Sequence, residues 1–309
     1  MSDPFPFAAR PIIEVQRLTR QFDSKIALND LSLIVPRGGV FGLIGGNGAG
    51  KTTLIRHILG MLKAQSGSVR VFGLDPVENP VGVLGRIGYL SEDRDLPNWM
   101  RVHELTRYTQ AFYPNWDVKY AEKLREAFDL DPKAKVKTLS RGQRARAGLL
   151  VALAHRPELL VLDEPSSGLD PVVRRDILGA IIRTIADEGR TVFFSSHLLD
   201  EVERVADRVA IIHQGRVILT ATIDDLKESH RRITLRFGHA MSQPPALVGT
   251  LACEGGGAEW TYVCNGQLEQ LRRAAAEIGG TIMEDSALSL DEIFVARIQE
   301  FDQPRGLVN

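Results

Sequence analysis

The sequence predicts an α/β fold with a mostly parallel sheet at its core, a helical insert and a small C-terminal α+β appendage. Two observations carry this prediction. Short β-branched runs are almost wholly apolar, as strands buried on both faces of a parallel sheet are, and helical patterns separate most of them. The apolar runs lie at 12–15, 40–44, 87–90, 159–162, 191–195 and 209–212. The helical patterns between them lie at 51–62, 171–186 and 197–205.

A helical insert is predicted between Glu92 and His155, where the strand patterns stop. Three helix-like segments occupy this part of the chain, at 102–112, 118–128 and 140–154. The change from alternating strands and helices to helices alone indicates a subdomain inserted into the α/β domain. We therefore expect the insert to span 92–155.

The pattern changes again after Val217, and a small α+β domain is the simplest account of the remaining residues. The expected domains are an N-terminal extension at 1–11, an α/β domain at 12–219 and an accessory domain at 220–309. Helices are expected at 223–229, 267–278 and 289–299, and strands at 233–237, 260–263 and 281–283. Glycines at 254–258 and the pair Pro244 and Pro245 predict loose connections inside this domain.

The composition of the sequence narrows the classes of protein to which the chain can belong. The 309 residues exceed the usual size of one domain, and 38 basic against 39 acidic groups leave a net charge of -1, so no charge imbalance points to nucleic acid. Cys253 and Cys264 form neither a disulfide framework nor a zinc pattern, which favours a reduced compartment. No segment has the pattern of an export signal or a membrane span, so a cytoplasmic location is expected.

The strongest local pattern is a glycine-rich loop between the apolar run ending at Ile44 and the helix starting near Lys51. It satisfies the P-loop pattern with Gly45, Gly46, Asn47, Gly48, Ala49, Gly50, Lys51 and Thr52. Glycines let consecutive backbone N–H groups point at phosphate oxygens, and the helix N-terminus adds its positive dipole end. Lys51 is expected to reach the β- and γ-phosphates, and the Thr52 hydroxyl to coordinate Mg²⁺.

Two carboxylates come directly after the apolar run at 159–162. Asp163 ends a predicted strand at the carboxyl edge of the sheet, where ligands bind in open α/β folds, so it is expected to hold Mg²⁺ directly or through water. Glu164 is placed to polarise the attacking water. The pair therefore predicts hydrolysis of the γ-phosphate rather than binding alone.

Three further motifs occur in a fixed order. The signature-like sequence is Leu139, Ser140, Arg141, Gly142 and Gln143; residues 165–170 read Pro, Ser, Ser, Gly, Leu and Asp; and Ser195 and Ser196 precede His197. With the P-loop and the Asp163–Glu164 pair, these motifs closely resemble the ATP-binding-cassette (ABC) ATPases across residues 12–217. The resemblance implies a P-loop NTPase ABC cassette with an N-terminal antiparallel β portion, an ATPase activity, and ATP and Mg²⁺ as cofactors.

The resemblance also implies a role for each motif residue. The catalytic residues are expected to be Glu164, His197 and Lys51, with His197 contacting the γ-phosphate. The expected metal ligands are Thr52, Asp163 and Glu92. The nucleotide is expected to contact Phe22, which stacks on adenine, and Gly45, Asn47, Gly48, Ala49, Gly50, Lys51, Thr52, Thr53, Ser140, Gly142, Gln143 and Asp170.

Similarity to this family implies two kinds of protein partner. The helix beginning near Ser140 would face the nucleotide of a second subunit, so that a homodimer, or a pair of ABC subunits, sandwiches two ATP molecules head to tail. A separate integral membrane permease would hold the ATPase at the inner face of the membrane, and no nucleic acid is expected. Trp99 with Met100, residues 112–117 and residues 289–294 are similar to ATPases of small bacterial exporters for antibiotics or ions.

Two positions depart from the family pattern. Arg141 stands where a second glycine is usual, and it either adds positive charge near the opposing γ-phosphate or points to solvent. Glu92 stands where a glutamine is usual. It keeps an oxygen that can reach Mg²⁺ or water but adds a charge, so its role as a metal ligand stays open.

Aromatic residues are crowded around and after Glu92. Seven of the chain's twenty lie within 32 residues: Tyr89, Trp99, Tyr108, Phe112, Tyr113, Trp116 and Tyr120. They form either a ring-rich core of the insert or a docking groove for a cytoplasmic helix of the permease, since aromatic residues dominate interface anchors.

Two other classes of protein share the P-loop. A soluble ABC ATPase acting on nucleic acid or a macromolecular assembly would typically need two cassettes or a long coiled-coil insertion. The sequence has one P-loop, no heptad array and no basic stripe. The interpretation as a small-molecule kinase does not explain the motifs at 140–143 and 165–170. A transporter ATPase is the interpretation that uses every motif.

Overall fold

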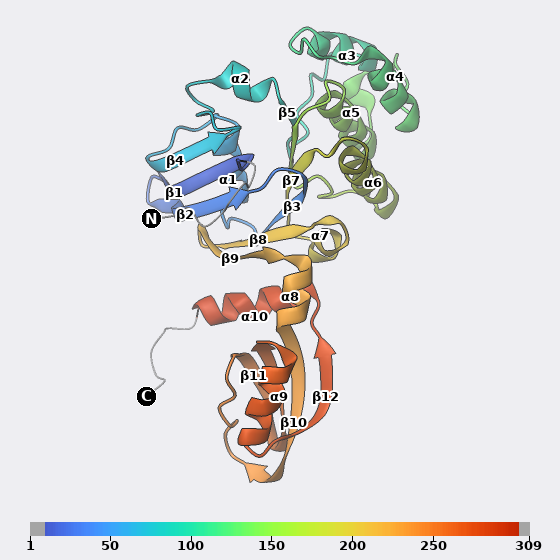
Figure 1. The fold of residues 1–309 in the computed structure, drawn as a ribbon. Helices are drawn as coiled ribbons and strands as arrows, with labels where there is room; N and C mark the ends of the chain where they lie inside the picture. Colours follow the sequence, from blue (N-terminus) through green and yellow to red (C-terminus); the bar gives the residue numbers. More distant parts are fainter. Residues whose placement is uncertain (1–9, 303–309) are drawn as a thin grey trace. The chain divides into compact units, whose positions relative to one another are not determined.

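The computed structural model describes residues 10–302, which divide into two compact units (Figure 1). The first unit comprises residues up to 206 together with 212–217, and the second comprises 207–211 and the residues from 218 onward. The division passes through two neighbouring strands, β8 (Arg208–His213) and β9 (Arg216–Thr222). Each unit is built around its own sheet and helices.

An antiparallel sheet opens the first unit, with strand order β2-β1-β4. Its strands are β1 (Ile13–Phe22), β2 (Lys25–Val35) and β4 (Ser66–Val71). In β2, buried residues such as Leu31, Leu33 and Val35 alternate with exposed ones, so that one face of the sheet packs inward. The tight connection between β1 and β2 places Phe22 opposite Lys25. This is the antiparallel portion that the family resemblance implied.

The central sheet has the order β5-β6-β7-β3-β8-β9. Its strands β5 (Ile87–Leu90), β6 (Leu159–Asp163), β7 (Thr191–Ser196) and β3 (Gly39–Ile44) pair in parallel. Every residue of β6 and β7 is buried, which explains their unbroken apolar sequences. The register aligns Asp163 with Ser195 and Ile44 with Ser196, so the ends of three strands meet at one edge of the sheet.

Helices connect these strands and form the insert. The connecting helices are α1 (Lys51–Ile58), α2 (Pro80–Leu84), α6 (Pro171–Glu188) and α7 (Leu199–Val205). The insert, drawn in green in Figure 1, contains α3 (Val102–Gln110), α4 (Val118–Ala127), the short 3₁₀ helix η1 (Val136–Thr138) and α5 (Arg141–Leu153). The helix α5 packs closely on β5: a Cβ at Gly88 would lie 2.1 Å from the carbonyl oxygen of Ala152, and one at Gly148 would lie 2.6 Å from the side chain of Leu90.

The second unit contains a three-stranded antiparallel sheet of order β11-β10-β12 and flanking helices. Its elements are α8 (Ile223–Ser229), β10 (His230–Met241), β11 (Thr250–Asn265), α9 (Leu268–Glu277), β12 (Thr281–Ala287) and α10 (Leu290–Asp302). Alternate residues Ile233, Leu235 and Phe237 of β10 pack against Leu271 and Ala275 of α9. The helix α10 contacts β11.

The predicted fold class is confirmed, and the differences concern the bounds of particular helices and strands. The helix expected at 51–62 ends at Ile58. The pattern at 12–15 marks the start of the longer strand β1, which begins at Ile13, and the pattern at 260–263 is part of the longer strand β11.

The glycines at 254–258, predicted to form a loose connection, fall inside the bounds of β11, but the chain turns back there. Gly255 and Gly257 have positive φ, and a Cβ at Gly255 would lie 2.6 Å from the carbonyl oxygen of Glu259. Gly257 lies opposite Met241 of β10.

Within residues 10–302, none of the helices combines the length and the apolar character that crossing a bilayer would require. The two cysteines are both free thiols, and Cys264 is buried.

Acidification is expected to destabilise the second unit through His230. This side chain is buried, its Nδ1 lies 3.0 Å from the Leu226 carbonyl oxygen, and Arg297 Nε donates to its Nε2 at 3.1 Å. Burial, reinforced by Arg297, lowers the pKa of His230 below its usual 6.5. Below about pH 6.5 the imidazole of His230 becomes protonated in the unfolded chain while it stays neutral in the folded chain. The contribution of His230 to the free energy of unfolding is therefore fully present above about pH 6.5, and it is lost as the pH falls toward the folded-state pKa.

The check is urea unfolding of the chain at pH 7.5 and 5.5, followed by tryptophan fluorescence, to which the buried Trp260 of the second unit contributes. We expect His230→Asn, which keeps a donor toward Leu226, to lose less stability on acidification than the parent. His239→Asn, an exposed position on the same strand, is the control and should behave like the parent. Equal losses in all three proteins would contradict the assignment.

Candidate active site

The glycine-rich loop joins the end of β3 to the start of α1, as its sequence predicts. Gly50 is the N-cap of α1, has φ +113° and supplies no side-chain cap, so the first N–H groups of the helix keep no side-chain partner. A Cβ at Gly50 would lie 2.6 Å from the carbonyl oxygen of Ala27, and one at Gly45 would lie 2.6 Å from that of Ile212. Only glycine fits at these two positions, and the loop turns its backbone toward a cavity.

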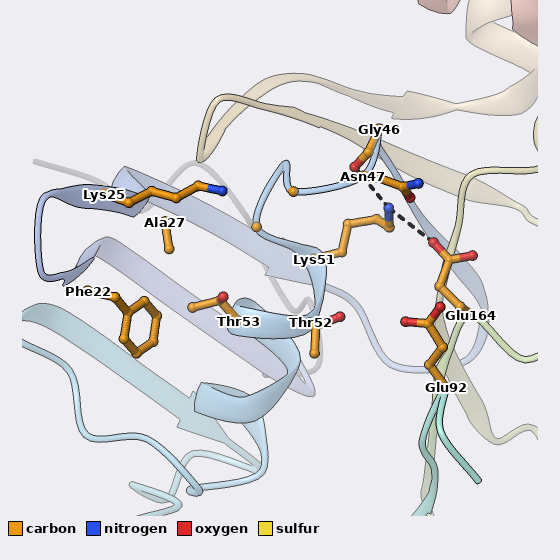
Figure 2. A pocket seen from close by; sticks show the side chains of 12 residues that line it. Phe22, Lys25, Ala27, Gly46, Asn47, Lys51, Thr52, Thr53, Glu92 and Glu164 are labelled. Carbon is orange, nitrogen blue, oxygen red and sulfur yellow. Dashed lines mark hydrogen bonds and ion pairs between the residues drawn. The ribbon is translucent and has the colours of Figure 1, made fainter.

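Lys51 is buried beneath this loop. Its Nζ donates to the carbonyl oxygens of Gly45 at 2.7 Å and Gly46 at 3.1 Å, and it lies 3.0 Å from Oε1 of Glu164 (Figure 2). Both charged side chains are nearly inaccessible to solvent. The ammonium group is therefore held at the centre of the loop by oxygen atoms alone, where it can interact with a further anionic oxygen.

Glu164 is held from three sides. Its backbone adopts a left-handed conformation, with φ +47°, directly after β6. Its N–H donates to Ser195 Oγ at 2.9 Å, and its Oε2 lies 2.7 Å from Nδ1 of His197. The carboxylate thus bridges Lys51 and His197, two side chains that lie far apart in the sequence.

Asp163, Thr52 and Ser195 form a second group of oxygens beside the first. Ser195 Oγ donates to Asp163 Oδ1 at 2.6 Å, and the Thr52 side chain also hydrogen-bonds to Asp163. The hydrogen bond to Ser195 is a consequence of the register, because Asp163 and Ser195 are paired residues on β6 and β7. Burial raises the pKa of the Asp163 carboxyl despite both hydrogen bonds.

A cavity of about 430 Å³ opens above these residues. Figure 2 shows Phe22 at one end, Lys51, Thr52 and Thr53 along the middle, and Glu92 and Glu164 at the other end. The complete lining is Phe22, Lys25, Ala27, Gly46, Asn47, Gly48, Gly50, Lys51, Thr52, Thr53, Glu92 and Glu164. An aromatic ring at one end and phosphate-binding groups at the other suit a nucleotide. The Arg20 guanidinium lies 4.6 Å from the centre of the Phe22 ring.

Negative charge is crowded at the far end of this cavity. Burial, and then the neighbouring Glu164 and Asp163, raise the pKa of the Glu92 carboxyl, while Lys51 opposes the shift. Within residues 10–302 no three His, Cys, Asp or Glu side chains form a ready-made metal cage. A metal at this position would therefore take part of its coordination from a bound phosphate and from water, as Mg²⁺ usually does.

The signature residues lie outside the cavity lining of the same chain. Ser140 is the N-cap of α5: its Oγ accepts from Gln143 N at 3.2 Å, and Gln143 Oε1 accepts from Ser140 N at 3.0 Å. Gly142 is buried, and a Cβ there would lie 2.7 Å from the side chain of Val173. Asp170 Oδ1 accepts from the N–H groups of Val172 and Val173 at the start of α6.

Three site residues were missed by sequence reasoning. Lys25 and Ala27 line the cavity opposite the loop, and nothing in their local sequence distinguishes them from other strand residues. Ser195 was noted only as a neighbour of His197, yet it contacts both Asp163 and Glu164. Their position depends on strand pairing, which the local sequence does not state.

Comparison with known proteins agrees with this geometry. Residues 28–167 match the family model described as ABC transporter. The daunorubicin/doxorubicin resistance ATP-binding protein DrrA of Streptomyces peucetius is 34% identical, covering 92% of this chain and 91% of that protein. The chain belongs to the ABC transporter family. It is an ATP-binding subunit, with the ATPase fold and activity of that family.

Two further likenesses extend the comparison of this ABC subunit. The bacitracin transport ATP-binding protein BcrA of Enterococcus faecalis is 33% identical over 72% of this chain and 73% of its own length. A solved structure described as the ATP binding subunit of an ABC transporter superposes with a TM-score of 0.65. It is 28% identical and covers 70% of this chain and 92% of that one.

Proposed function

We propose that this ABC subunit hydrolyses Mg-ATP between two copies of itself, or between itself and a paired subunit, and thereby drives a membrane permease in export. The observation that carries the proposal is the chain of contacts from the buried Lys51 through the buried Glu164, both in the lining of the nucleotide-sized cavity, to the more exposed His197. It places the carboxylate that would act as the base in contact with a phosphate-binding cation on one side and with the His197 imidazole on the other.

Each of these residues has a chemical task in this proposal. Lys51 and the N–H groups of the loop neutralise the phosphates, and Glu164 accepts a proton from the attacking water. His197, hydrogen-bonded to Glu164, orients that carboxylate and contacts the γ-phosphate. Phe22 stacks on the adenine. Thr52 and Asp163, with Glu92 nearby, would hold Mg²⁺, which would offset the crowded negative charge and stabilise the phosphate oxygens.

The capped start of α5 supports the sandwich dimer. Ser140, Gly142 and Gln143 lie at a helix N-terminus, which favours anions, yet they do not line the cavity of their own chain. Asp170 is likewise outside it. We assign these residues to the nucleotide of the opposing subunit. Arg141 is exposed and lies beside the motif at 165–170. Its Nη1 would be 3.4 Å from a Cβ placed on Gly168 of that motif.

The exposed aromatic residues of the insert support docking to a permease. Trp99, Tyr108 and Phe112 expose 74%, 51% and 63% of their surfaces, and the buried cluster described for the insert is Met100, Leu105 and Val136. The rings therefore lie on the surface rather than in that cluster. A groove of about 450 Å³ lies at the junction of insert and sheet, lined by Tyr89 and residues 90–96 among others. Docking there places the subunit at the inner face of the membrane.

Export is the direction that the relatives favour. The names of DrrA and BcrA refer to drug resistance and bacitracin transport, and both match this chain beyond the shared motifs. We further propose that 12–219 forms the ATPase domain and that the domain from 220 is accessory to it.

Trp99→Ala is expected to weaken docking without impairing the ATPase cycle. The indole is exposed and lies outside the cavity lining, so its removal should leave the basal turnover of the isolated subunit within about twofold. Loss of one interface anchor typically costs about 2 kcal/mol, or roughly 30-fold in affinity. Co-purification with its membrane permease measures the effect.

Ile34→Ala serves as the matched control, because Ile34 is an equally apolar, 60% exposed side chain on the antiparallel sheet. It should co-purify like the parent. Full retention of the permease by Trp99→Ala would contradict docking through this residue, and loss of folding would favour a structural role for the ring.

A further inference from the structure

The segment immediately after Glu164 is hydrogen-bonded to two buried side chains from different parts of the chain. Residues 165–167 are held on their main-chain carbonyls by Arg94 and on the side chain of Ser166 by Glu201. Neither Arg94 nor Glu201 lines the nucleotide cavity. Both contacts therefore act on the position of the segment that carries Glu164, not on the nucleotide.

Arg94 reaches this segment from the loop that comes after β5. Its Nη2 donates to the carbonyl oxygen of Ser167 at 2.7 Å and to that of Pro165 at 3.3 Å, and only 7% of the residue is exposed. It lies two positions after Glu92, and its backbone has φ +51°, a strained conformation for arginine. Arg94 also lines the groove at the junction of insert and sheet.

Glu201 holds the same segment from a different element. It lies in α7, four residues after His197, and is 2% exposed. Ser166 Oγ donates to its Oε2, and Arg174 Nε lies 2.9 Å from its Oε1. Glu201 is therefore neutralised by a partner of opposite charge, whereas Arg94 contacts two neutral carbonyls.

The stability of the folded chain alone does not explain why a charged side chain is buried at Arg94. Burial lowers the pKa of its guanidinium, and the nearby Arg141 lowers it further, while Glu92 opposes the shift. An apolar side chain of similar length would avoid both the desolvation and the repulsion. What an apolar side chain lacks is the Nη2 group, which donates to two carbonyls at once.

The geometry points to Arg94 as a positioning residue for ATP hydrolysis: it fixes the segment after Glu164 relative to the loop that bears Glu92. This inference rests on the proposed function of Glu164 and adds a residue that none of the motifs contains. Because Arg94 lines the groove and also donates to residues 165 and 167, one side chain contacts both the groove and the segment after Glu164.

The test compares Arg94→Met and Arg94→Lys with the parent in full-length protein. Arg94→Met keeps the length and removes every donor, so we expect kcat for ATP to fall at least tenfold. The Kd for ATP, measured calorimetrically in EDTA, should stay within twofold, because Arg94 does not touch the cavity. Arg94→Lys keeps one donor that can reach Ser167, and it should recover part of kcat.

Arg101→Met is the matched control, since Arg101 also donates to a main-chain carbonyl, that of Lys133, but far along the insert from 165–167. It should retain the kcat of the parent. Unchanged kcat in Arg94→Met, or a Kd that weakens in step with kcat, would overturn the inference. If Arg94→Met does not fold, the result for Arg94→Lys decides. An intermediate kcat with an unchanged Kd for ATP supports a positioning role for Arg94, and a parental kcat overturns it.

Parental turnover in Glu164→Gln would instead overturn the proposed function.

Discussion

Glu164→Gln is expected to lower ATP turnover by at least 100-fold while leaving ATP bound. General bases contribute about 10²- to 10⁴-fold to catalysis, and a neutral amide cannot accept the proton of the attacking water. The amide keeps the size of the carboxylate and an oxygen that can still approach Lys51, so the loop that binds the phosphates should stay in place. With Mg-ATP, the variant should accumulate as a dimer in size-exclusion chromatography with light scattering.

Glu158→Gln is the matched control for this experiment. Glu158 lies beside the opposite end of β6, where it forms ion pairs with Arg86 and Arg37 on the surface. It should hydrolyse ATP like the parent. A Glu164→Gln protein that stays monomeric in saturating Mg-ATP would count against the sandwich, and one with parental turnover would remove Glu164 from its proposed role.

Lys51→Ala is expected to weaken ATP binding itself by about 10- to 150-fold. A hydrogen bond to a charged group contributes about 1.5–3 kcal/mol, and each 1.4 kcal/mol is a factor of ten in affinity. The substitution also leaves the buried Glu164 without its ammonium partner, so the thermal midpoint should fall as well. Isothermal titration calorimetry with ATP measures the first effect, and thermal denaturation the second.

Lys119→Ala, on the exposed surface of α4, controls for the loss of a positive charge. It should bind ATP with parental affinity. Folded Lys51→Ala protein with unchanged ATP affinity would show that this lysine does not bind the phosphates.

The central strands could be predicted because burial on both faces leaves a pattern within each strand's own sequence. β5 and β6 are buried on both faces, so their sequences are continuous apolar runs that stand out from the helices around them. β2 and β4 escaped detection for the opposite reason. Half of each strand faces solvent, β2 includes Lys25 and Asp30, and β4 begins with Ser66 and Gly67. Only pairing with β1 stabilises such segments as strands.

The candidate site was predictable as motifs but not as contacts. The P-loop and the Asp163–Glu164 pair were expected to meet, because the carboxyl ends of parallel strands share one edge of a sheet. The ion pair between Lys51 and Glu164, and the hydrogen bond of Ser195 to Asp163, depend on the register of β3, β6 and β7. The buried contact of Arg94 depends in addition on how the loop after β5 folds back.

The role of Glu92 is better defined by the geometry than by the sequence. The sequence left its role as a metal ligand open, and the structure places it in the cavity lining beside Glu164 and Asp163. Its carboxyl carries a raised pKa because of burial and these neighbours. A charge here is compatible with a nearby cation, and we retain Glu92 as a proposed contact of Mg²⁺ or its water.

The sandwich mechanism depends on where Ser140 lies once ATP is bound. The most direct measurement is a crystal structure of the Glu164→Gln protein grown with Mg-ATP. We predict two chains in contact, with Ser140 Oγ of each within about 3 Å of a terminal phosphate oxygen held by the other chain's loop. A structure in which ATP occupies the loop while Ser140 remains remote from every phosphate of the neighbouring chain would contradict the mechanism.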